Sequence, residues 1–180
     1  MHITVFGGSH PTPGSPDYEN AVRLGKILGS AGHVVLTGGY MGTMEGVSRG
    51  AAEVGAHVIG VTCVGIESWR PVKPNAWVAE ERRLPTLALR IMTLIEDSQA
   101  ALALPGGPGT LTEISLMWNL LLTKAITARP LILIGEGWNA VFNTIFDKLG
   151  NNIPEDQRKW LSFAPDVDAG AMLLNSYFHK

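Results

Sequence analysis

The sequence predicts a three-layer α/β fold in which a mainly parallel central sheet is flanked by helices. Short apolar segments alternate with amphipathic segments along most of the 180 residues. The apolar segments are near-continuous rather than alternating, as expected for strands that are covered on both faces. No stretch rich in Pro, Gly or Ser divides the chain, so residues 1–180 are expected to form a single domain.

The first three strands are predicted from short apolar runs that glycines precede or follow. The helix between the first two runs has its apolar residues at helical spacing, and Gly32 ends it. The elements expected here are a strand over 3–8, a helix over 17–30 with Ala21, Leu24, Ile27 and Leu28 on one face, a strand over 33–37, a helix from 43 to about 54 and a strand over 57–62.

The second half of the chain continues the alternation of strands and helices. Two further apolar runs predict strands, and the segments around them have helical periodicity. The elements expected here are a helix over 84–95, a strand over 100–104, a helix from 110 to about 123, a strand over 131–134, a helix over 138–149 and a last helix over 169–177.

The segment 64–83 is the longest piece without a clear pattern. It carries Trp69, Trp77 and the charge run Glu80-Glu81-Arg82-Arg83. A connection of this length is often a functional lid, and either tryptophan is a candidate to cover a bound base. The alternative is a solvated loop that leads into the start of a helix.

Charge and composition exclude several classes of function. The net charge of −2 gives no basic stripe of the kind that nucleic-acid binding requires. The single cysteine, Cys63, excludes a disulfide framework and is expected to be a small buried apolar residue. The histidines show no metal-ligand spacing, so no metal is expected. The N-terminus lacks a signal-peptide pattern and no apolar run reaches about 18 residues, so a soluble cytoplasmic protein without membrane contact is expected.

Two glycine turns of the same form each follow an apolar strand and open a helix. The first amides of such a helix point outward without partners at the positive end of the helix dipole, where a phosphate binds well. In a parallel sheet both turns lie at the carboxyl edge, where ligands bind. The residues expected to bind a phosphorylated ligand are Gly38, Gly39, Gly42 and Thr43 in the first turn, Gly106, Gly107, Gly109 and Thr110 in the second, and Gly8 and Ser9 after the first strand.

Other interpretations of these turns remain open. Glycine-rich turns also serve as tight connections between packed elements. The common nucleotide signatures are missing: no G-x-G-x-x-G follows the first strand, and no P-loop sequence occurs. The pattern therefore disfavours NAD and P-loop ATP chemistry, and leaves a different nucleotide or another phosphorylated ligand as the expected partner. His10 is a further candidate for a phosphate contact.

Arg90 is the only charged residue within a helix that is apolar nearly all round. Such a helix is buried by its own protein or by a partner chain, so self-association is expected. A buried guanidinium needs a carboxylate or an anionic ligand, because an unpaired charge is costly to bury. The alternative is that the side chain extends along the helix to solvent.

Glu113 stands three residues after Thr110, at the expected start of a helix. This spacing is that of a capping box, in which the glutamate bonds to a backbone amide at the helix start. The local pattern favours that structural role. Glu113 is nevertheless the best carboxylate candidate at the predicted anion-binding edge.

Residues 105–113 read Pro-Gly-Gly-Pro-Gly-Thr-Leu-Thr-Glu and match the P-G-G-x-G-T-x-x-E signature of the LOG family. These proteins are cytokinin riboside 5'-monophosphate phosphoribohydrolases. Residues 38–44 and 58–61 resemble the same family, and the resemblance extends from about residue 3 to 138. Arg90 stands at the same distance before the signature as the arginine of the family's M-x-E-R-K segment, although Leu89 and Ile91 replace its neighbours Glu and Lys.

The resemblance implies a Rossmann-like fold, usually a homodimer, that binds a nucleoside 5'-monophosphate and requires no cofactor. It implies hydrolysis of the bond between an adenine-type purine and the ribose, with release of free base and ribose 5-phosphate. In that interpretation Glu113 stabilises the cationic sugar and positions water, and Arg90 orients the substrate or Glu113. The alternative is a non-catalytic carrier or sensor of a nucleotide or a molybdenum cofactor-like ligand. It is motivated by apolar residues at positions where the family has polar ones, Leu89 and Ile91 beside Arg90 and Leu116 and Leu122 after Glu113. In either case the expected partner is a small molecule rather than nucleic acid.

Overall fold

The computed structural model describes residues 1–178 and contains one seven-stranded sheet in which every strand pair is parallel. The strand order is β4-β3-β2-β1-β5-β6-β7. The predicted three-layer α/β fold is therefore confirmed. The strands are β1 (His2–Phe6), β2 (Val34–Thr37), β3 (Val58–Cys63), β4 (Glu80–Leu84), β5 (Ala100–Ala103), β6 (Leu131–Ile134) and β7 (Ser162–Ala164).

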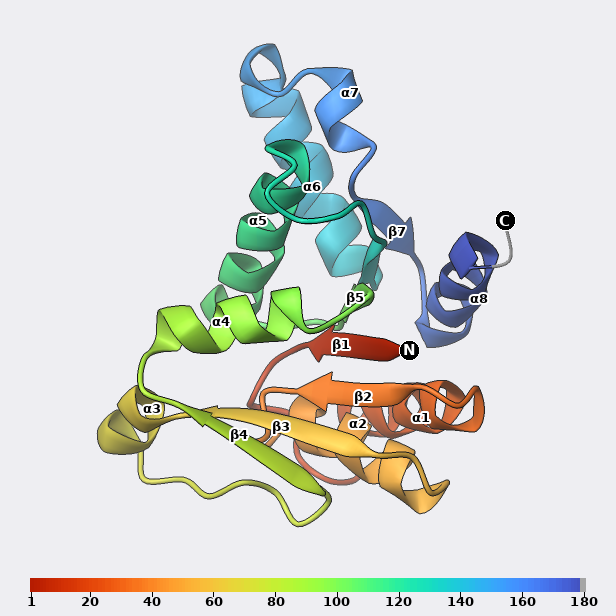
Figure 1. The fold of residues 1–180 in the computed structure, drawn as a ribbon. Coiled ribbons are helices and arrows are strands. Elements are labelled where there is room, and N and C mark those ends of the chain that lie inside the picture. Colours follow the sequence, from red (N-terminus) through yellow and green to blue (C-terminus); the bar gives the residue numbers. More distant parts are fainter. Residues whose placement is uncertain (179–180) are drawn as a thin grey trace.

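Helices cover both faces of the sheet (Figure 1). One hydrophobic cluster joins α1, α2 and α8 to one face, and a second joins α4, α5 and α6 to the other. Five strands lie inside the sheet and three of them are buried at every residue, which explains their near-continuous apolar sequences. The helices are α1 (Pro16–Ser30), α2 (Thr43–Glu53), α3 (Val64–Trp69), α4 (Leu87–Glu96), α5 (Pro108–Leu122), α6 (Glu136–Leu149), α7 (Glu155–Arg158) and α8 (Val167–Phe178), with a 3-10 turn at Gly150–Asn152.

The direction of the chain across the sheet reverses between β1 and β5. From β1 the chain proceeds outward to β2, β3 and β4, and it then returns through α4 to β5 on the other side of β1. Ligands of open α/β sheets bind at the carboxyl edge beside such a reversal. The carboxyl ends of β1 to β4 point to the left in Figure 1, toward α3 and the start of α4.

The segment 64–83 is not a structureless connection, so the expectation of a long loop is wrong. It contains α3, and its charge run forms β4 at the edge of the sheet, with Glu80 opposite Ile59 and Leu84 opposite Cys63. Arg82 pairs with Glu80 and Asp97. Backbone pairing and ion pairs hold this strand, which has no apolar run for sequence analysis to detect. Charged edge strands also discourage pairing with other chains.

Other boundaries differ from the expectation by a few residues. The helix expected from 84 begins at Leu87, because Thr86 caps it by accepting a hydrogen bond from the amide of Leu89. The short elements β7 and α7 were not predicted. Cys63 is fully buried at the end of β3, as expected. Among the helices within residues 1–178, none combines the length and apolar character needed to cross a bilayer.

Candidate functional site

A cavity of about 420 Å³ opens at the carboxyl edge of the sheet, beside the reversal between β1 and β5. Its wall is formed by the loop after β1, the start of α5, one side of α4 and the end of α3. Of the predicted site residues, the cavity brings together Gly8, Ser9, Arg90, Gly107, Gly109, Thr110 and Glu113. His10 also lines it.

Arg90 is buried, with only 5% of its surface exposed, and its guanidinium is fixed from three sides. Nε donates to the carbonyl of Val61 at 2.8 Å, and one terminal nitrogen donates to the carbonyl of Gly38 at 3.2 Å. The other lies 3.5 Å from Oε1 of Glu113. The guanidinium carbon also lies 5.8 Å from the ring centre of Tyr40. Arg90 is therefore held by the backbone of the sheet edge and does not extend to solvent.

Glu113 is 7% exposed and faces Arg90 across the cavity wall. Burial raises the pKa of this carboxyl to about 7, because the guanidinium of Arg90, 3.5 Å away, only partly offsets the loss of hydration. A carboxyl with a pKa near neutrality is suited to proton transfer at physiological pH. The capping role favoured by local sequence is wrong, since α5 begins at Pro108 with Gly107 as its N-cap and Glu113 lies in the second turn.

The glycines and the threonine of the first turn lie behind the cavity, whereas Tyr40 of the same turn lines it. Neither Gly38, Gly39, Gly42 nor Thr43 lines the cavity. The backbone amide and the hydroxyl of Thr43 both donate to the carbonyl of Gly8, at 2.9 and 3.0 Å. This turn therefore positions the loop after β1 and, through Gly38, the guanidinium of Arg90. Gly106 lines a neighbouring hollow of about 440 Å³ together with Gly8 and Gly107.

Gly42 and Gly109 provide a matched test of this arrangement. Gly42 has a φ of +76°, and a Cβ there would lie 2.3 Å from the carbonyl oxygen of Gly8. We expect Gly42→Ala to cost at least about 1–3 kcal/mol from backbone strain alone and to lower the melting temperature by several degrees. Gly109→Ala meets no atom within 4 Å and adds a better helix former to α5, so its melting temperature should not fall. Equal losses in the two variants, measured by thermal unfolding, would contradict this account.

The cavity also contains residues that sequence analysis did not assign to it. Tyr40 is fixed by its hydroxyl, which accepts from the amide of Cys63 at 2.7 Å. Trp69, one of the two candidates to cover a base, lines the cavity and is 78% exposed, whereas Trp77 does not line it. Arg70 also lines the cavity, and no sequence pattern marks it, because it lies in the irregular segment 64–83. The remaining unassigned lining residues are Gly7, Met44, Ile66, Leu87, Ile91, Pro108 and Thr112.

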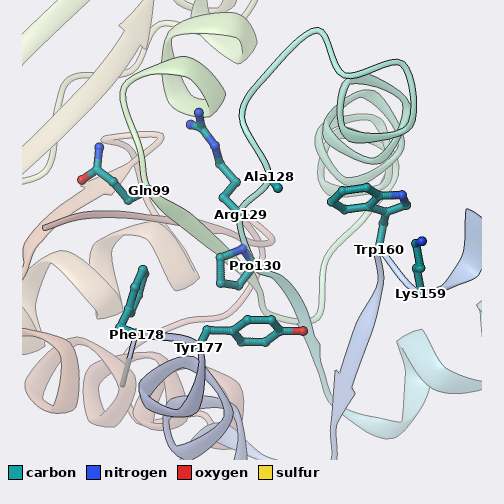
Figure 2. A pocket seen from close by; sticks show the side chains of 8 residues that line it. All are labelled: Gln99, Ala128, Arg129, Pro130, Lys159, Trp160, Tyr177 and Phe178. Atoms are coloured by element: carbon teal, nitrogen blue, oxygen red, sulfur yellow. The ribbon is translucent and has the colours of Figure 1, made fainter. Parts of the chain in front are cut away.

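A second cavity, of about 500 Å³, lies at the opposite edge of the sheet, before the starts of β5, β6 and β7 (Figure 2). Arg129 is its most prominent cation, but its guanidinium donates to the carbonyls of Ile95, Glu96 and Ser98 at the end of α4. In Figure 2 this side chain points away from Tyr177 and Phe178. The guanidinium of Arg129 is thus occupied by the carbonyls at the end of α4. The candidate site is therefore the cavity at the carboxyl edge, where Arg90 and Glu113 lie.

No metal centre is formed by the side chains that the structure describes. Within residues 1–178, no three His, Cys, Asp or Glu side chains gather closely enough to bind an ion. His179 lies outside the described residues.

The parallel sheet, the cavity at its point of reversal and the buried glutamate–arginine pair define a Rossmann-like protein with a candidate site at the carboxyl edge of its sheet. The chain belongs to the SLOG cluster4 family, whose model matches residues 1–148. The resemblance to LOG proteins seen in the sequence is confirmed.

Similar proteins come from plants and bacteria. A probable cytokinin riboside 5'-monophosphate phosphoribohydrolase of Oryza sativa is 30% identical, over 97% of this chain and 78% of that protein. The pyrimidine/purine nucleotide 5'-monophosphate nucleosidase of Escherichia coli K12 is 29% identical over 92% of this chain, which spans only 39% of that protein. Among solved structures, the molybdenum cofactor binding protein of Rippkaea orientalis is 26% identical, with a TM-score of 0.76 over 98% of this chain and 96% of that one.

Proposed function

We propose that this protein hydrolyses the N-glycosidic bond of a purine nucleoside 5'-monophosphate and releases free base and ribose 5-phosphate. The proposal rests on the position of Glu113. Its buried carboxyl, with a pKa of about 7, lies in the wall of a cavity that the start of α5 also lines. Similarity to the plant phosphoribohydrolase and the bacterial nucleosidase supports the same reaction class.

The phosphate group binds at the start of α5 in this proposal. Gly107, Gly109 and Thr110 line the cavity there, and the first amides of a helix have no partners within it. The helix dipole adds a favourable field for an anion. Gly8 and Ser9 form the facing side of the same end.

The sugar lies against Glu113. As the bond between base and ribose breaks, positive charge develops on the sugar, and a nearby carboxylate stabilises that charge. The same carboxylate accepts a proton from the attacking water, whose oxygen bonds to the sugar carbon. The departing base takes up a proton from solvent water, and Glu113 then returns its proton to solvent, so that one water is consumed in all. Arg90 orients Glu113 and is itself held by the carbonyls of Val61 and Gly38.

A second candidate function is that of a non-catalytic carrier or sensor of a phosphorylated ligand. It is supported by the apolar residues Leu89 and Ile91 beside Arg90 and by similarity to the molybdenum cofactor binding protein. A carrier would retain its ligand through purification and release no base.

One experiment separates the two candidates. The purified protein is incubated with AMP, GMP, IMP, CMP and UMP, and free base and ribose 5-phosphate are measured by mass spectrometry. AMP is included because the family resemblance implies an adenine-type base. Hydrolysis predicts equal amounts of the two products from purine nucleotides and none from nucleosides without phosphate. A protein that retains a ligand but cleaves no nucleotide would favour the carrier.

We also propose that the chain forms a homodimer through the start of α4. Leu87 and Leu89 are 50% and 49% exposed, and Leu111 on α5 is 38% exposed. Apolar side chains that are exposed together near a cavity are typical of an interface. Light scattering of the protein in solution should give twice the 19.3 kDa mass of the chain, and Leu89→Glu should shift it toward the monomer.

A further inference from the structure

Arg70 is a charged residue of the cavity wall. Within residues 1–178 its side chain makes no hydrogen bond or ion pair, and its Nε is buried and unsatisfied. Its guanidinium carbon lies 5.7 Å from the ring centre of Trp69, which also lines the cavity. A buried donor without a partner is costly, so a ligand that offers an acceptor at this place gains an interaction the protein alone leaves unmade.

Arg70 lies at the opposite end of the cavity from the start of α5. It follows α3, which leaves the sheet from β3, whereas α5 leaves from β5. These strands are three spacings apart, which corresponds to about 14 Å. The Arg90–Glu113 pair bridges the space between, because Arg90 bonds to Val61 on β3 and faces Glu113 on α5. A nucleotide with its phosphate at α5 and its sugar at Glu113 therefore directs its base toward Arg70.

The side chains around Arg70 fit a flat base better than a second phosphate. Trp69, Ile66, Leu87 and Ile91 give this end an apolar and aromatic wall. The carboxylate nearest in sequence, Glu67, does not line the cavity and is engaged with Arg83 and Tyr40. The polar group that can bind a base at this end of the cavity is thus the guanidinium of Arg70, which donates hydrogen bonds and accepts none.

We propose that Arg70 selects 6-oxopurine nucleotides over the adenine nucleotide by donating to O6 and N7 of the base. A 6-oxopurine presents two adjacent acceptors on this edge, and arginine binds such a pair with two parallel hydrogen bonds. Adenine has an amino group in place of O6, which points a donor at the guanidinium. This inference rests on the proposed nucleotide site and makes IMP or GMP, rather than AMP, the preferred ligand.

The test compares IMP with AMP, which differ at position 6 of the purine, in the wild type, Arg70→Ala, Arg70→Lys and Arg23→Ala. Arg23 is a surface arginine paired with Asp168, away from the cavity, and serves as the control. We expect the wild type to prefer IMP roughly 5- to 150-fold in kcat/KM. Arg70→Ala should bring this ratio close to one, mainly through loss of activity on IMP. Arg70→Lys should give an intermediate ratio, and Arg23→Ala should leave it unchanged.

Dissociation constants for IMP, AMP and ribose 5-phosphate, measured by calorimetry, separate this inference from the proposed reaction. If the wild type cleaves neither nucleotide, the proposed reaction is wrong, but an Arg70-dependent preference for binding IMP still supports the inference. An IMP-to-AMP ratio that Arg70→Ala does not change overturns it, whether or not cleavage occurs. Equal weakening of IMP, AMP and ribose 5-phosphate also overturns it, because Arg70 would then bind an anion.

Discussion

Glu113→Gln is expected to lower kcat/KM for nucleotide cleavage by roughly 100- to 1,000-fold or more, the loss typical of removing one electrostatic stabiliser of a transition state. Glutamine has nearly the same shape and fits beside Arg90, but it carries no charge to stabilise the sugar and accepts no proton from water. Because Arg90 is also held by Val61 and Gly38, its position should be preserved. Nucleotide binding should therefore change much less than turnover.

The same variant should have a pH-dependent effect on stability. The pKa of Glu113 is raised from 4.5 to about 7 in the folded protein, so the folded state binds this proton more tightly than the unfolded state. The free energy of unfolding of the wild type therefore falls progressively as the pH rises from about 4.5 to 7. Above pH 7 the loss is about 3 kcal/mol. Glu113→Gln removes it, so its melting temperature should exceed that of the wild type at pH 8 and be close to it at pH 4.5.

Glu155→Gln, on the exposed face of α7, is the control and should change neither cleavage nor the pH dependence of melting. Cleavage at the wild-type rate by Glu113→Gln would refute the assigned role of this carboxylate. A Glu113→Gln protein that is less stable than the wild type at pH 8 but equal to it at pH 4.5 would contradict the raised pKa.

Arg90→Ala is expected to abolish cleavage and to destabilise the fold by about 3–5 kcal/mol, because it leaves the buried Glu113 without a counter-charge. It also leaves the carbonyls of Val61 and Gly38 without their donor. In a chain of this length the loss corresponds to a fall in melting temperature of roughly 6–20 °C. Without Arg90 the pKa of Glu113 should rise further, so the carboxyl should remain protonated at neutral pH.

A double variant tests whether the two residues act as a pair. Arg90→Ala with Glu113→Gln removes the unpaired carboxyl, so at pH 8 Glu113→Gln should stabilise the Arg90→Ala protein by more than it stabilises the wild type. Arg49→Ala, which breaks a surface pair with Glu53 on α2, is the control and should have little effect. If Glu113→Gln changes the stability at pH 8 by the same amount with and without Arg90, the pair contributes no coupling to stability.

Most of the fold could be predicted because the inner strands are apolar on both faces. Five of the seven strands stand out as apolar runs, and the longer helices carry regular apolar stripes. The two strands that escaped prediction, β4 and β7, lie at the two edges of the sheet. An edge strand is covered on fewer sides, so β4 can consist almost entirely of charged residues and still pair with β3.

The candidate site was predictable only where a local pattern marks it. The turn before α5 is visible in sequence because glycines precede a helix start, and it lines the cavity. The similar turn before α2 is equally visible, yet Thr43 bonds to Gly8 and lies behind the cavity. No local sequence pattern marks Arg70 as a residue of the cavity.

The sequence by itself determined the order of the five inner strands and the longer helices, the glycine turns, and the need of Arg90 for an anionic partner. Only the tertiary structure decided that this partner is Glu113, which stands 23 residues away and had the local signature of a helix cap. It also decided that Arg70 reaches the same cavity. The physical reason is that periodicity fixes which face of an element is buried, whereas contacts between distant residues depend on the order of strands in the sheet, which no local pattern encodes.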